Sequence, residues 1–554
     1  MRELINSVSK KEWVFVGIIT AVIIILTTVP YIFGYLMAPS NTVYNGIHAL
    51  SPGDIPVYYS NINQVIEGDF LVKNLFTAED QSIGTFNVWW FLVGLVAKIF
   101  GLSVILVFQL SRIFMIPVFI FISYLFVAYF IQSVPQRKIS LIFILFSSGA
   151  GFWMAGLIDT VTFADTTTYW WPIDLWLTEA ITFNALYQTS HFIASITLTL
   201  LIFLLMLLAF EKNRFNYAVI SGFLALFYFN FHPYYLPVIF GVLGLYLFVL
   251  FLQASKILWR QMGYLVTVFL ISFPSIIYHF WLIQASPVIG QRAVQNVTNI
   301  SPLPFVLIGY GFLLPGFFLG LYWLIKRKSL NIKFIFLLIW LGLNVVLIYS
   351  PFPFHSRYTQ GIQIIFSIFT VVGLFYAKDY LKSKLKANTY ELCCNNLFLF
   401  LVIFIIWFTP SNFYSVSRDL YYFYSQPPGA KIRLYLSSDI FKAFDWLSQQ
   451  TSPKTVLAAE LPAKFIPGFS GQSVYLAHAH ETLFFYSKIE YLQWLLRDNF
   501  NNEAELNFLV EQKIDYIFYS DFEKALGSFD PATKDYLTIV FDSPQVQIYQ
   551  VVKE

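Results

Sequence analysis

The sequence predicts a polytopic α-helical membrane protein of about eleven transmembrane helices with a small α/β domain at its C-terminal end. Hydrophobic residues make up 58% of the 554 residues and charged residues only 12%, well below the roughly one quarter that is usual in soluble domains. The apolar residues run in blocks near the length of about 20 residues that crosses a bilayer. After residue 410 such blocks stop. Together these observations exclude a soluble globular enzyme, a disordered chain and a coiled coil.

Eleven apolar blocks are the predicted spans. They cover residues 13–37, 103–131, 139–158, 191–210, 216–231, 234–254, 262–283, 303–325, 333–350, 361–378 and 396–410. The first block is too long for a signal sequence and no small-residue cleavage site follows it, so we expect an uncleaved first helix. The segment Phe86–Gly101 is apolar but has only 16 residues. We therefore expect it to be an interfacial or re-entrant helix and not a further crossing.

The basic residues are concentrated on one side of the predicted spans. The N-terminus and the short loops on that side hold 17 Lys and Arg, whereas the other side of residues 1–410 holds five: Lys73, Lys98, Arg112, Arg292 and Arg357. Because basic loops stay in the cytoplasm, we expect a plasma-membrane protein with a cytoplasmic N-terminus. An odd number of spans then places the C-terminal region outside. The predicted domains are residues 1–410, with long outer loops 38–102 and 159–190, and residues 411–554.

Residues 411–554 predict an extracytoplasmic α/β domain. Alternating side chains indicate strands at 455–458, 515–519 and 546–551, and helices are predicted at 439–449, 479–499 and 503–512. The string His478-Ala479-His480-Glu481 lacks the i, i+4 spacing of histidines in a helical zinc site. We expect a packing or surface turn there, with metal binding as the alternative.

The main candidate residue in the first outer loop is Asp54. Apolar residues recur at helical spacing from Ile55 to Ile66, which indicates an interfacial helix that starts near Asp54. A carboxylate at a helix N-terminus is favoured in its ionised form by the helix dipole. The local pattern alone favours an N-cap role for Asp54 over a catalytic role.

Further acidic residues form a second candidate site for an acceptor or a metal ion. Glu67 and Asp69 follow in the first outer loop, and Asp174 and Glu179 flank an amphipathic stretch of the second outer loop. Carboxylate oxygens are suitable ligands for a divalent cation. The alternative for these residues is a solvated acidic loop.

Arginines near the outer ends of the predicted spans are candidates for binding a phosphate, and two histidines there are candidate supporting residues. His191 begins one span and His232 stands beside Pro233 in an outer turn, where a histidine is usually structural. Arginine binds phosphate through two parallel hydrogen bonds, which favours Arg357, then Arg292 and Arg112. The alternatives are that Arg112 pairs with an internal carboxylate and that Arg357 snorkels to the interface.

These features together resemble a bacterial membrane glycosyltransferase of the GT-C superfamily, with the layout of its mannosyl- and arabinosyltransferases. The resemblance covers the whole chain: a first helix, a long outer loop with an early acidic residue, a second acidic outer loop and a terminal outer domain. The residues that carry it are Asp54 with Glu67-Gly68-Asp69-Phe70, Ser148-Gly149-Ala150-Gly151, Asp174 to His191, His232-Pro233-Tyr234, Ser301-Pro302 with Gly309-Tyr310-Gly311, Arg357, Phe469-Ser470-Gly471, His480-Glu481-Thr482 and Lys488.

The resemblance implies transfer of a sugar from a polyprenyl-phosphate-linked donor to an extracytoplasmic acceptor in the cell envelope. It implies that Asp54 is the general base for the acceptor hydroxyl and that Arg357, with Arg292, stabilises the departing lipid phosphate. With this layout the catalytic role of Asp54 is favoured over the cap role, and the two are compatible. A Mg²⁺ or Mn²⁺ ion shared by Asp54 and Asp174 or Glu179 ranks below a metal-free mechanism, because the Asp-x-Asp pair of metal-dependent members is missing.

The expected partners are the lipid-linked donor, a glycan, lipid or protein acceptor, and the bilayer. A net charge of +3 is too small to indicate a nucleic-acid partner. A transporter or flippase for a lipid-linked sugar is the alternative function, but the inverted repeats and paired broken helices of transporters are not evident in the sequence. A membrane scaffold is a third hypothesis, which the acidic outer loops disfavour.

Overall fold

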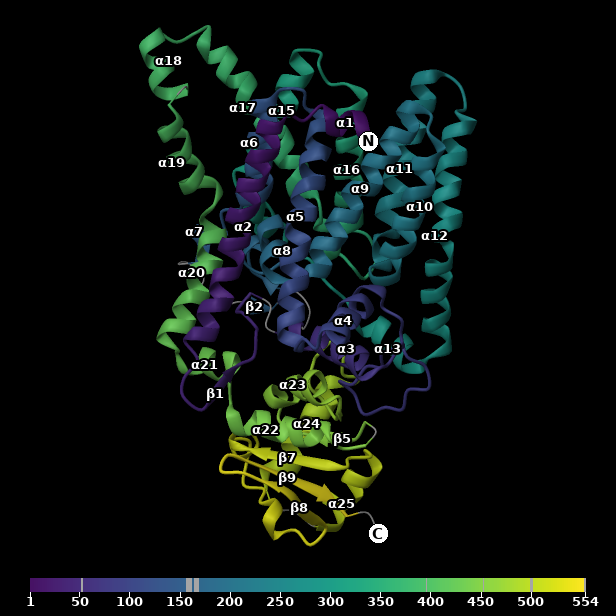
Figure 1. Cartoon of the computed structure of the whole chain (residues 1–554), viewed down its shortest axis with the longest axis vertical. Helices are drawn as coiled ribbons and strands as arrows, with labels where there is room; N and C mark the ends of the chain where they lie inside the picture. The colour runs from purple at the N-terminus through teal and green to yellow at the C-terminus, as the bar shows by residue number, and fades with distance from the viewer. Residues whose placement is uncertain are drawn as a thin grey trace. The chain divides into compact units, whose positions relative to one another are not determined.

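The computed structural model describes residues 1–50, 53–155, 162–163, 169–394, 396–451, 453–498 and 502–552. These residues are mostly helical, with a small mixed sheet close to the C-terminal end of the chain (Figure 1). They divide into two compact units, each built from three separate stretches. Unit 1 comprises Met1–Pro30, Ser111–Tyr278 and Val297–Arg418, and unit 2 comprises Tyr31–Leu110, His279–Asn296 and Asp419–Glu554. The predicted domain boundary at residue 410 stays a prediction.

Long apolar helices account for most of the chain. Within the described residues, seven segments are long and apolar enough to cross a membrane. Four are single helices: Lys10–Leu36 (α2), Val104–Phe130 (α5), Ser190–Lys212 (α9) and Trp259–Ala285 (α12). Three are made of two elements each: Val134–Phe146 (α6) with Gly151–Ala155 (α7), Pro233–Tyr235 (η2) with Leu236–Ala254 (α11), and Ser356–Thr359 (η3) with Ile362–Lys382 (α17). Two bent pairs bring the number to nine if each pair is one span: Leu303–Tyr310 (α14) with Leu313–Lys326 (α15), and Leu397–Phe408 (α19) with Pro410–Ser425 (α20). The fold class of a polytopic helical membrane protein is confirmed.

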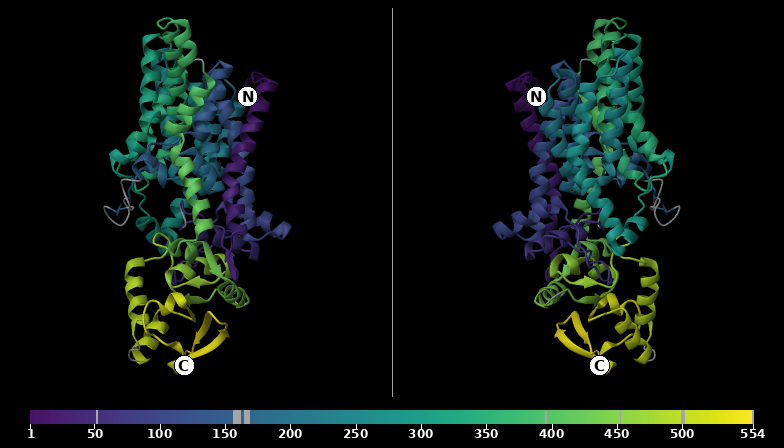
Figure 2. Two further views of the ribbon diagram at one scale, coloured as in Figure 1. Left: turned by 90° about the vertical axis from the view of Figure 1, so that its left-hand side faces the viewer. Right: turned by 90° about the vertical axis from the view of Figure 1, so that its right-hand side faces the viewer.

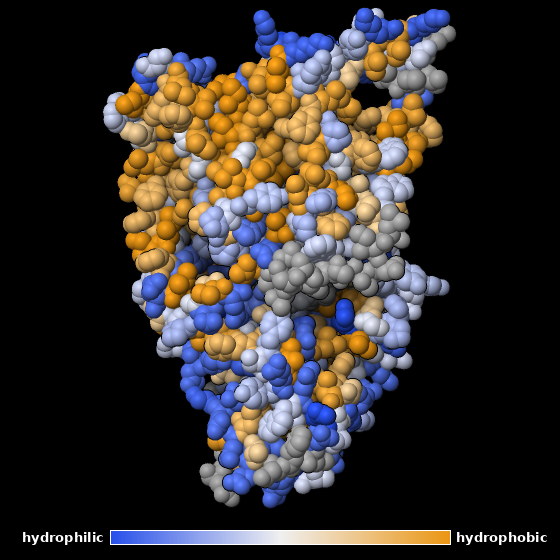
Figure 3. All heavy atoms as spheres, turned by 180° about the vertical axis from the view of Figure 1, so that it is seen from behind, coloured by the Kyte–Doolittle hydropathy of each residue, from blue (hydrophilic) through white to orange (hydrophobic). Residues whose placement is uncertain are grey.

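The remaining two predicted spans are apolar helices of 17 residues, Phe215–Phe231 (α10) and Ile332–Ile348 (α16). At 1.5 Å per residue such a helix is about 26 Å long, somewhat less than the roughly 30 Å hydrocarbon core of a bilayer. Each of the eleven predicted blocks therefore corresponds to an apolar helix or helix pair, of which seven to nine reach spanning length. Hydrophobic residues gather over the long helices on the face that Figure 3 shows.

Two helices of unit 1 approach each other closely because both carry glycine at the contact. A Cβ atom on Gly320 of α15 would lie 2.0 Å from the carbonyl oxygen of Phe369 in α17, and one on Gly373 would lie 2.6 Å from the backbone nitrogen of Gly320. Small residues permit this backbone contact between membrane helices, where packing and not the hydrophobic effect drives association. The contact holds α17, which follows the segment around Arg357, in place.

In unit 2, α3 (Ile55–Glu67) and α4 (Val88–Phe100) pack together. A Cβ atom on Gly94 would lie 2.6 Å from the Cβ of Val65, and the rings of Tyr58 and Trp90 stack with centroids 4.9 Å apart. The helix predicted within residues 86–101 is present. Asn87 caps its N-terminal end, where the Asn87 side chain accepts a hydrogen bond from the backbone nitrogen of Trp90. Its place at the membrane interface stays a prediction.

The C-terminal sheet has five strands in the order β6 (Ser473–Val474), β5 (Thr455–Leu457), β7 (Tyr516–Ser520), β9 (Val546–Val551) and β8 (Leu537–Asp542). The first three strands are parallel, and β9 and β8 are antiparallel to their neighbours. Successive side chains of a strand point to opposite faces. Val456 therefore belongs to one hydrophobic cluster, together with Leu447, whereas Leu457 belongs to a second cluster, together with Leu495. Helices α22 (Ser438–Ser448) and α24 (Phe485–Arg497) therefore cover opposite faces of the sheet, which Figure 2 shows from two further sides.

The three predicted strands and three predicted helices of the C-terminal region are present, the third helix being α25 (Asn502–Glu511). The helix predicted at 479–499 begins only at Phe485, because the preceding residues form a hydrogen-bonded turn. Helix α23 (Glu460–Ser470) was not predicted, since Pro462 and Pro467 interrupt its pattern.

Short elements complete the chain. They are Arg2–Asn6 (α1), Thr42–Tyr44 (β1), Thr162–Phe163 (β2), Tyr169–Trp170 (β3), Ile173–Leu175 (η1), Thr182–Gln188 (α8), Pro287–Gln295 (α13), Ala387–Cys394 (α18), Pro428–Leu434 (α21), Tyr435–Ser437 (β4), Asp521–Lys524 (α26) and Pro531–Thr533 (η4). Strand β1 pairs with β4, and β2 pairs with β3. Residues 156–161 and 164–168 of the predicted second outer loop lie outside the described residues.

Candidate active site

The predicted site residues fall into two groups, one in each unit. Unit 2 holds Asp54, Glu67, Asp69 and Arg292, and unit 1 holds Arg112, Asp174, Glu179, His191, His232 and Arg357. We use the name Asp54 group for Asp54 with the turn 478–482, and Arg357 group for Glu179, His191, Phe192, His232 and Arg357. Each group makes its own set of contacts.

Asp54 stands directly before α3, as predicted, but its side chain makes no capping hydrogen bond among the described residues. Its backbone is helical (φ −81°, ψ −28°), whereas a capping residue usually has extended backbone. The Oδ1 atom lies instead 3.4 Å from Nε2 of His478, with 40% of the Asp54 side chain and 9% of the His478 side chain exposed. The helix start is therefore confirmed, while the hydrogen bond that the N-cap interpretation requires is not formed.

The turn that carries His478 is held by its own hydrogen bonds. The backbone nitrogen of His480 donates to Nδ1 of His478 at 3.2 Å. The hydroxyl of Thr482 accepts from the backbone nitrogen of His478 at 3.2 Å and donates to the carbonyl oxygen of Phe76 at 2.6 Å. The turn predicted from His478-Ala479-His480-Glu481 is thus present. Its contact with Asp54 was missed, although the motif itself was visible in the sequence.

Arg292, on α13, contacts the same turn. Its Nε atom lies 2.8 Å from Oε2 of Glu481, and Gln295 of the same helix donates to the carbonyl oxygen of Thr482 at 2.9 Å. The guanidinium of Arg292 therefore stabilises the turn through its ion pair with Glu481. A contact between Arg292 and a donor phosphate stays a prediction.

Glu67 and Asp69 lie at the far end of α3 from Asp54, and both are exposed. The helix has 13 residues, which at 1.5 Å per residue is about 20 Å. The structure therefore does not bring these two carboxylates together with Asp54.

In unit 1 the structure brings together Glu179 and Arg357, which the sequence placed in separate loops. Arg357, in η3, forms an ion pair with Glu179, and its guanidinium lies over the ring of Phe192, 5.5 Å from the centroid. Its carbonyl oxygen accepts a hydrogen bond from the hydroxyl of Tyr235 at 2.7 Å. The Glu179 side chain is 1% exposed and that of Arg357 is 25% exposed, so the carboxylate is buried and the arginine side chain is partly accessible.

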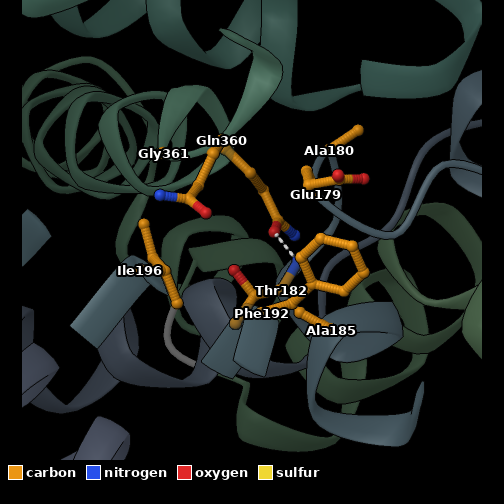
Figure 4. Close-up of a pocket in the computed structure, with 9 residues that line it drawn as sticks. Glu179, Ala180, Thr182, Ala185, Phe192, Ile196, Gln360 and Gly361 are labelled. Atoms are coloured by element: carbon orange, nitrogen blue, oxygen red, sulfur yellow. Dashed lines mark hydrogen bonds between the residues drawn. The ribbon is translucent and has the colours of Figure 1, made fainter. Parts of the chain in front are cut away.

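A small pocket lies beside this ion pair (Figure 4). It is lined by Glu179, Ala180, Thr182, Ala185, Phe192, Ile196, Gln360, Gly361 and Gln363. The Gln363 side chain accepts from the backbone nitrogen of Thr182 at 2.6 Å, the dashed bond in Figure 4, and donates to the carbonyl oxygen of Ser147 at 2.6 Å. The pocket thus offers a carboxylate, two amides and an aromatic ring, with Gln363 already engaged inside the protein.

The two supporting histidines lie together in unit 1. The rings of His191 and His232 are 5.2 Å apart and edge-on, and both residues are buried. Nδ1 of His191 lies 2.9 Å from the hydroxyl of Thr189. Burial, together with nearby His191 and Arg357, lowers the pKa of His232 well below its ordinary value, so this ring is neutral. Among the described residues Nδ1 of His232 has no hydrogen-bond partner.

Asp174 and Arg112 are buried in unit 1, where each makes contacts of its own. Asp174, in η1, is wholly buried, and its Oδ2 atom accepts a hydrogen bond from the backbone nitrogen of Gly151 at 3.1 Å. Burial raises the pKa of Asp174 to about 7. Arg112 is also wholly buried and donates to the carbonyl oxygen of Leu186 at 3.1 Å and the hydroxyl of Thr28 at 3.2 Å.

The part of the chain that the structure describes contains no group of three or more His, Cys, Asp or Glu side chains placed to hold a metal ion. Oxygen ligands for a divalent cation are present singly, in Asp54 and in Glu179. A Mg²⁺ or Mn²⁺ ion stays a prediction from the family resemblance.

No protein-family model and no curated protein matches the sequence. The fold is similar to that of the oligosaccharyltransferase of Archaeoglobus fulgidus tethered to an acceptor peptide with the NVT sequon, with a TM-score of 0.52 at 12% identity, over 92% of this chain and 69% of that chain. The same enzyme in complex with zinc and sulfate gives a TM-score of 0.50 at 12% identity, over 89% of this chain and 68% of that one.

The fold is also similar to that of the arabinofuranosyltransferase AftD from Mycobacteria, with a TM-score of 0.51 at 10% identity. The match covers 99% of this chain but only 40% of AftD. At such low identity the likeness concerns the fold alone. The chain therefore has a fold like that of these two sugar transferases.

Proposed function

We propose that the protein is an integral membrane glycosyltransferase that transfers a sugar from a polyprenyl-phosphate-linked donor to an extracytoplasmic acceptor, with Asp54 as the general base. The placement of Asp54 carries this proposal: a half-exposed carboxylate at the start of α3 that does not cap its helix. The similar folds belong to an oligosaccharyltransferase and an arabinofuranosyltransferase, which both transfer sugars.

The reaction requires a proton acceptor at the attacking hydroxyl. The carboxylate of Asp54 takes the proton of the acceptor hydroxyl while the hydroxyl oxygen bonds to the anomeric carbon of the donor sugar. The bond from that carbon to the lipid phosphate breaks, and the phosphate leaves with the electron pair. The N-terminal end of α3 carries partial positive charge, which favours the ionised carboxylate that the first step needs.

The reaction also requires a cation where negative charge grows on the leaving phosphate. We infer that Arg357 has this role, because its side chain is partly exposed while its guanidinium contacts the buried carboxylate of Glu179 and the ring of Phe192. The neutral, buried ring of His232, with its Nδ1 lacking a partner among the described residues, supplies a hydrogen-bonding atom in the same group.

The proposal is tested with Asp54→Asn in purified protein, using synthetic short-chain polyprenyl-phosphate sugars and analysis of the product. General base catalysis contributes about 10²–10⁴-fold, so we expect the rate of transfer to fall by about 10³-fold. Melting temperature in detergent should change little, because the side chain is half-exposed and has no capping bond.

The matched control is Asp445→Asn, an exposed aspartate on α22 of the same unit, which should leave transfer unchanged. Full activity of Asp54→Asn would remove Asp54 as the base. Proteoliposomes that carry the donor across the membrane without any transfer to an acceptor would instead establish the transporter hypothesis.

A further inference from the structure

His478 stands between the last residues of β6 and the start of α24, and its ring faces the proposed base. We propose that His478 is a positioning residue that holds Asp54 through its Nε2–H group, in the neutral Nε2-protonated form. This inference rests on the proposed function, since it assigns a partner to the proposed base. It gives the C-terminal region a part in catalysis.

The protonation form follows from what each ring nitrogen faces. A backbone N–H group can only donate, and the one of His480 lies 3.2 Å from Nδ1 of His478. Nδ1 must therefore accept and carries no proton. A neutral imidazole has one N–H group, so the proton is on Nε2, the atom that lies 3.4 Å from Oδ1 of Asp54.

The position of the imidazole is fixed by the turn around it. The backbone nitrogens of Glu481 and Thr482 donate to the carbonyl oxygen of His478 at 3.1 Å and 2.8 Å. Glu481 is in turn paired with Arg292 of α13. Since only 9% of the His478 side chain is exposed, the ring has little freedom to turn away from Asp54.

Asp54 is more exposed than His478, with 40% of its side chain accessible. A base must present its oxygen to the acceptor hydroxyl in one orientation, and a misplacement of about 1 Å can cost about 10²-fold in rate. A donor fixed beside Oδ1 favours one orientation of the carboxylate. The distance of 3.4 Å exceeds that of a short N–H···O bond, as is common in active sites before substrate binds.

A purely structural role for His478 would consist of packing. Its ring lies 6.4 Å from that of Phe76 and 5.9 Å from that of His480, contacts that a phenylalanine would keep. The two roles therefore separate in a pair of variants. His478→Phe keeps a ring and removes the donor, while His478→Gln keeps an N–H donor on a side chain of similar reach.

The first measurement is the kinetics of sugar transfer by both variants. We expect His478→Phe to lower kcat by about 10- to 100-fold with an acceptor KM within about twofold of the unsubstituted protein, and His478→Gln to recover most of kcat. Equal kcat for His478→Phe and the unsubstituted protein, beside an inactive Asp54→Asn, would overturn this inference alone. Full activity of Asp54→Asn would overturn the base assignment, and with it this inference.

The second measurement does not depend on activity. The chain has seven histidines, so ¹⁵N-histidine labelling gives few ring signals, and the signals of His478 are identified by their loss in His478→Gln. We expect chemical shifts of a neutral ring protonated at Nε2. A ring protonated at Nδ1 would overturn the inference, whatever the kinetics show.

Discussion

The two groups of candidate residues differ in how their charges are balanced. In the Arg357 group the carboxylate of Glu179 is almost wholly buried and already has a cation as its partner. In the Asp54 group the carboxylate is half-exposed and lies 3.4 Å from Nε2 of His478, the ring to which we assign the neutral form. The Glu179 carboxylate therefore has a cationic partner, whereas the Asp54 carboxylate lies beside a histidine.

This difference indicates what each group must do when substrate binds. A phosphate that contacts Arg357 shares the guanidinium with Glu179, so binding at the Arg357 group reorganises an existing ion pair. An acceptor hydroxyl that approaches Asp54 meets a carboxylate that is half-exposed and lies beside the neutral donor we propose in His478. We therefore expect substitutions in the Arg357 group to change stability and activity together, and substitutions of Asp54 to change activity alone.

The strongest test of this comparison is Arg357→Ala. Loss of a donor that stabilises developing charge costs about 10²–10³-fold in rate. It also leaves Glu179 buried without its partner, and because Arg357 is partly exposed we expect a loss of about 2–3 kcal/mol in the free energy of unfolding, less than for a fully buried pair. Transfer assays and melting curves in the same detergent measure both effects.

The control for Arg357→Ala is the double variant Arg357→Ala with Glu179→Gln. Removing the unpaired charge should restore most of the melting temperature but none of the lost transfer. If Arg357→Ala were as stable as the unsubstituted protein, the two groups would not differ in the way that their burial indicates.

The sequence predicted the elements better than the contacts between them. Apolar periodicity located the helix after Asp54 because a helix of 13 residues repeats its pattern over several turns. The partner of Asp54 was not predictable in this way, since His478 lies in a turn with no periodicity, distant in sequence. The His478-Ala479-His480-Glu481 motif was nevertheless visible, and only its neighbour was unknown.

The same limit applies to the second acidic loop. Asp174 and Glu179 are five residues apart and were treated as one site, but Asp174 is buried against Gly151 and Glu179 faces Arg357. Side-chain direction in an irregular loop is set by tertiary packing, which residue type does not reveal. The pairing of Glu179 with Arg357 could be suspected from their charges alone, and only the fold brings them into contact.

The two carboxylates of this loop predict different responses to pH. Asp174 has no cation as a partner among the described residues, and burial raises its pKa from 3.8 to about 7. Between these values the folded protein binds more protons at this site than the unfolded chain does. Stability at this site is therefore present at low pH and is lost as pH rises towards 7.

Asp174→Asn removes this titration while it keeps an oxygen that accepts from Gly151. We expect the variant to be more stable than the unsubstituted protein, by an amount that grows by about 3 kcal/mol between pH 5 and pH 8. Melting curves over this range measure the effect, with Asp445→Asn as the exposed control. Curves that stay parallel from pH 5 to pH 8 would show that the interior accommodates the ionised form of Asp174.

Glu179→Gln is expected to have the smallest effect, and its sign tests the comparison most directly. The glutamine keeps the shape of the side chain and removes the charge that competes with a phosphate for Arg357. We expect a synthetic short-chain polyprenyl phosphate to bind about 3- to 10-fold more tightly, equivalent to roughly 1 kcal/mol. Isothermal titration calorimetry at one detergent concentration measures this change.

The control for Glu179→Gln is Glu460→Gln, which removes the carboxylate of an exposed pair with Lys464 in α23 and should leave the dissociation constant unchanged. Weaker binding by Glu179→Gln would mean that the carboxylate orients Arg357 for its ligand and does not compete with the phosphate. Glu179 would then orient Arg357 for its substrate, as we propose that His478 orients Asp54. Tighter binding would leave the contrast intact, because then the Arg357 group exchanges a charged protein partner for its substrate.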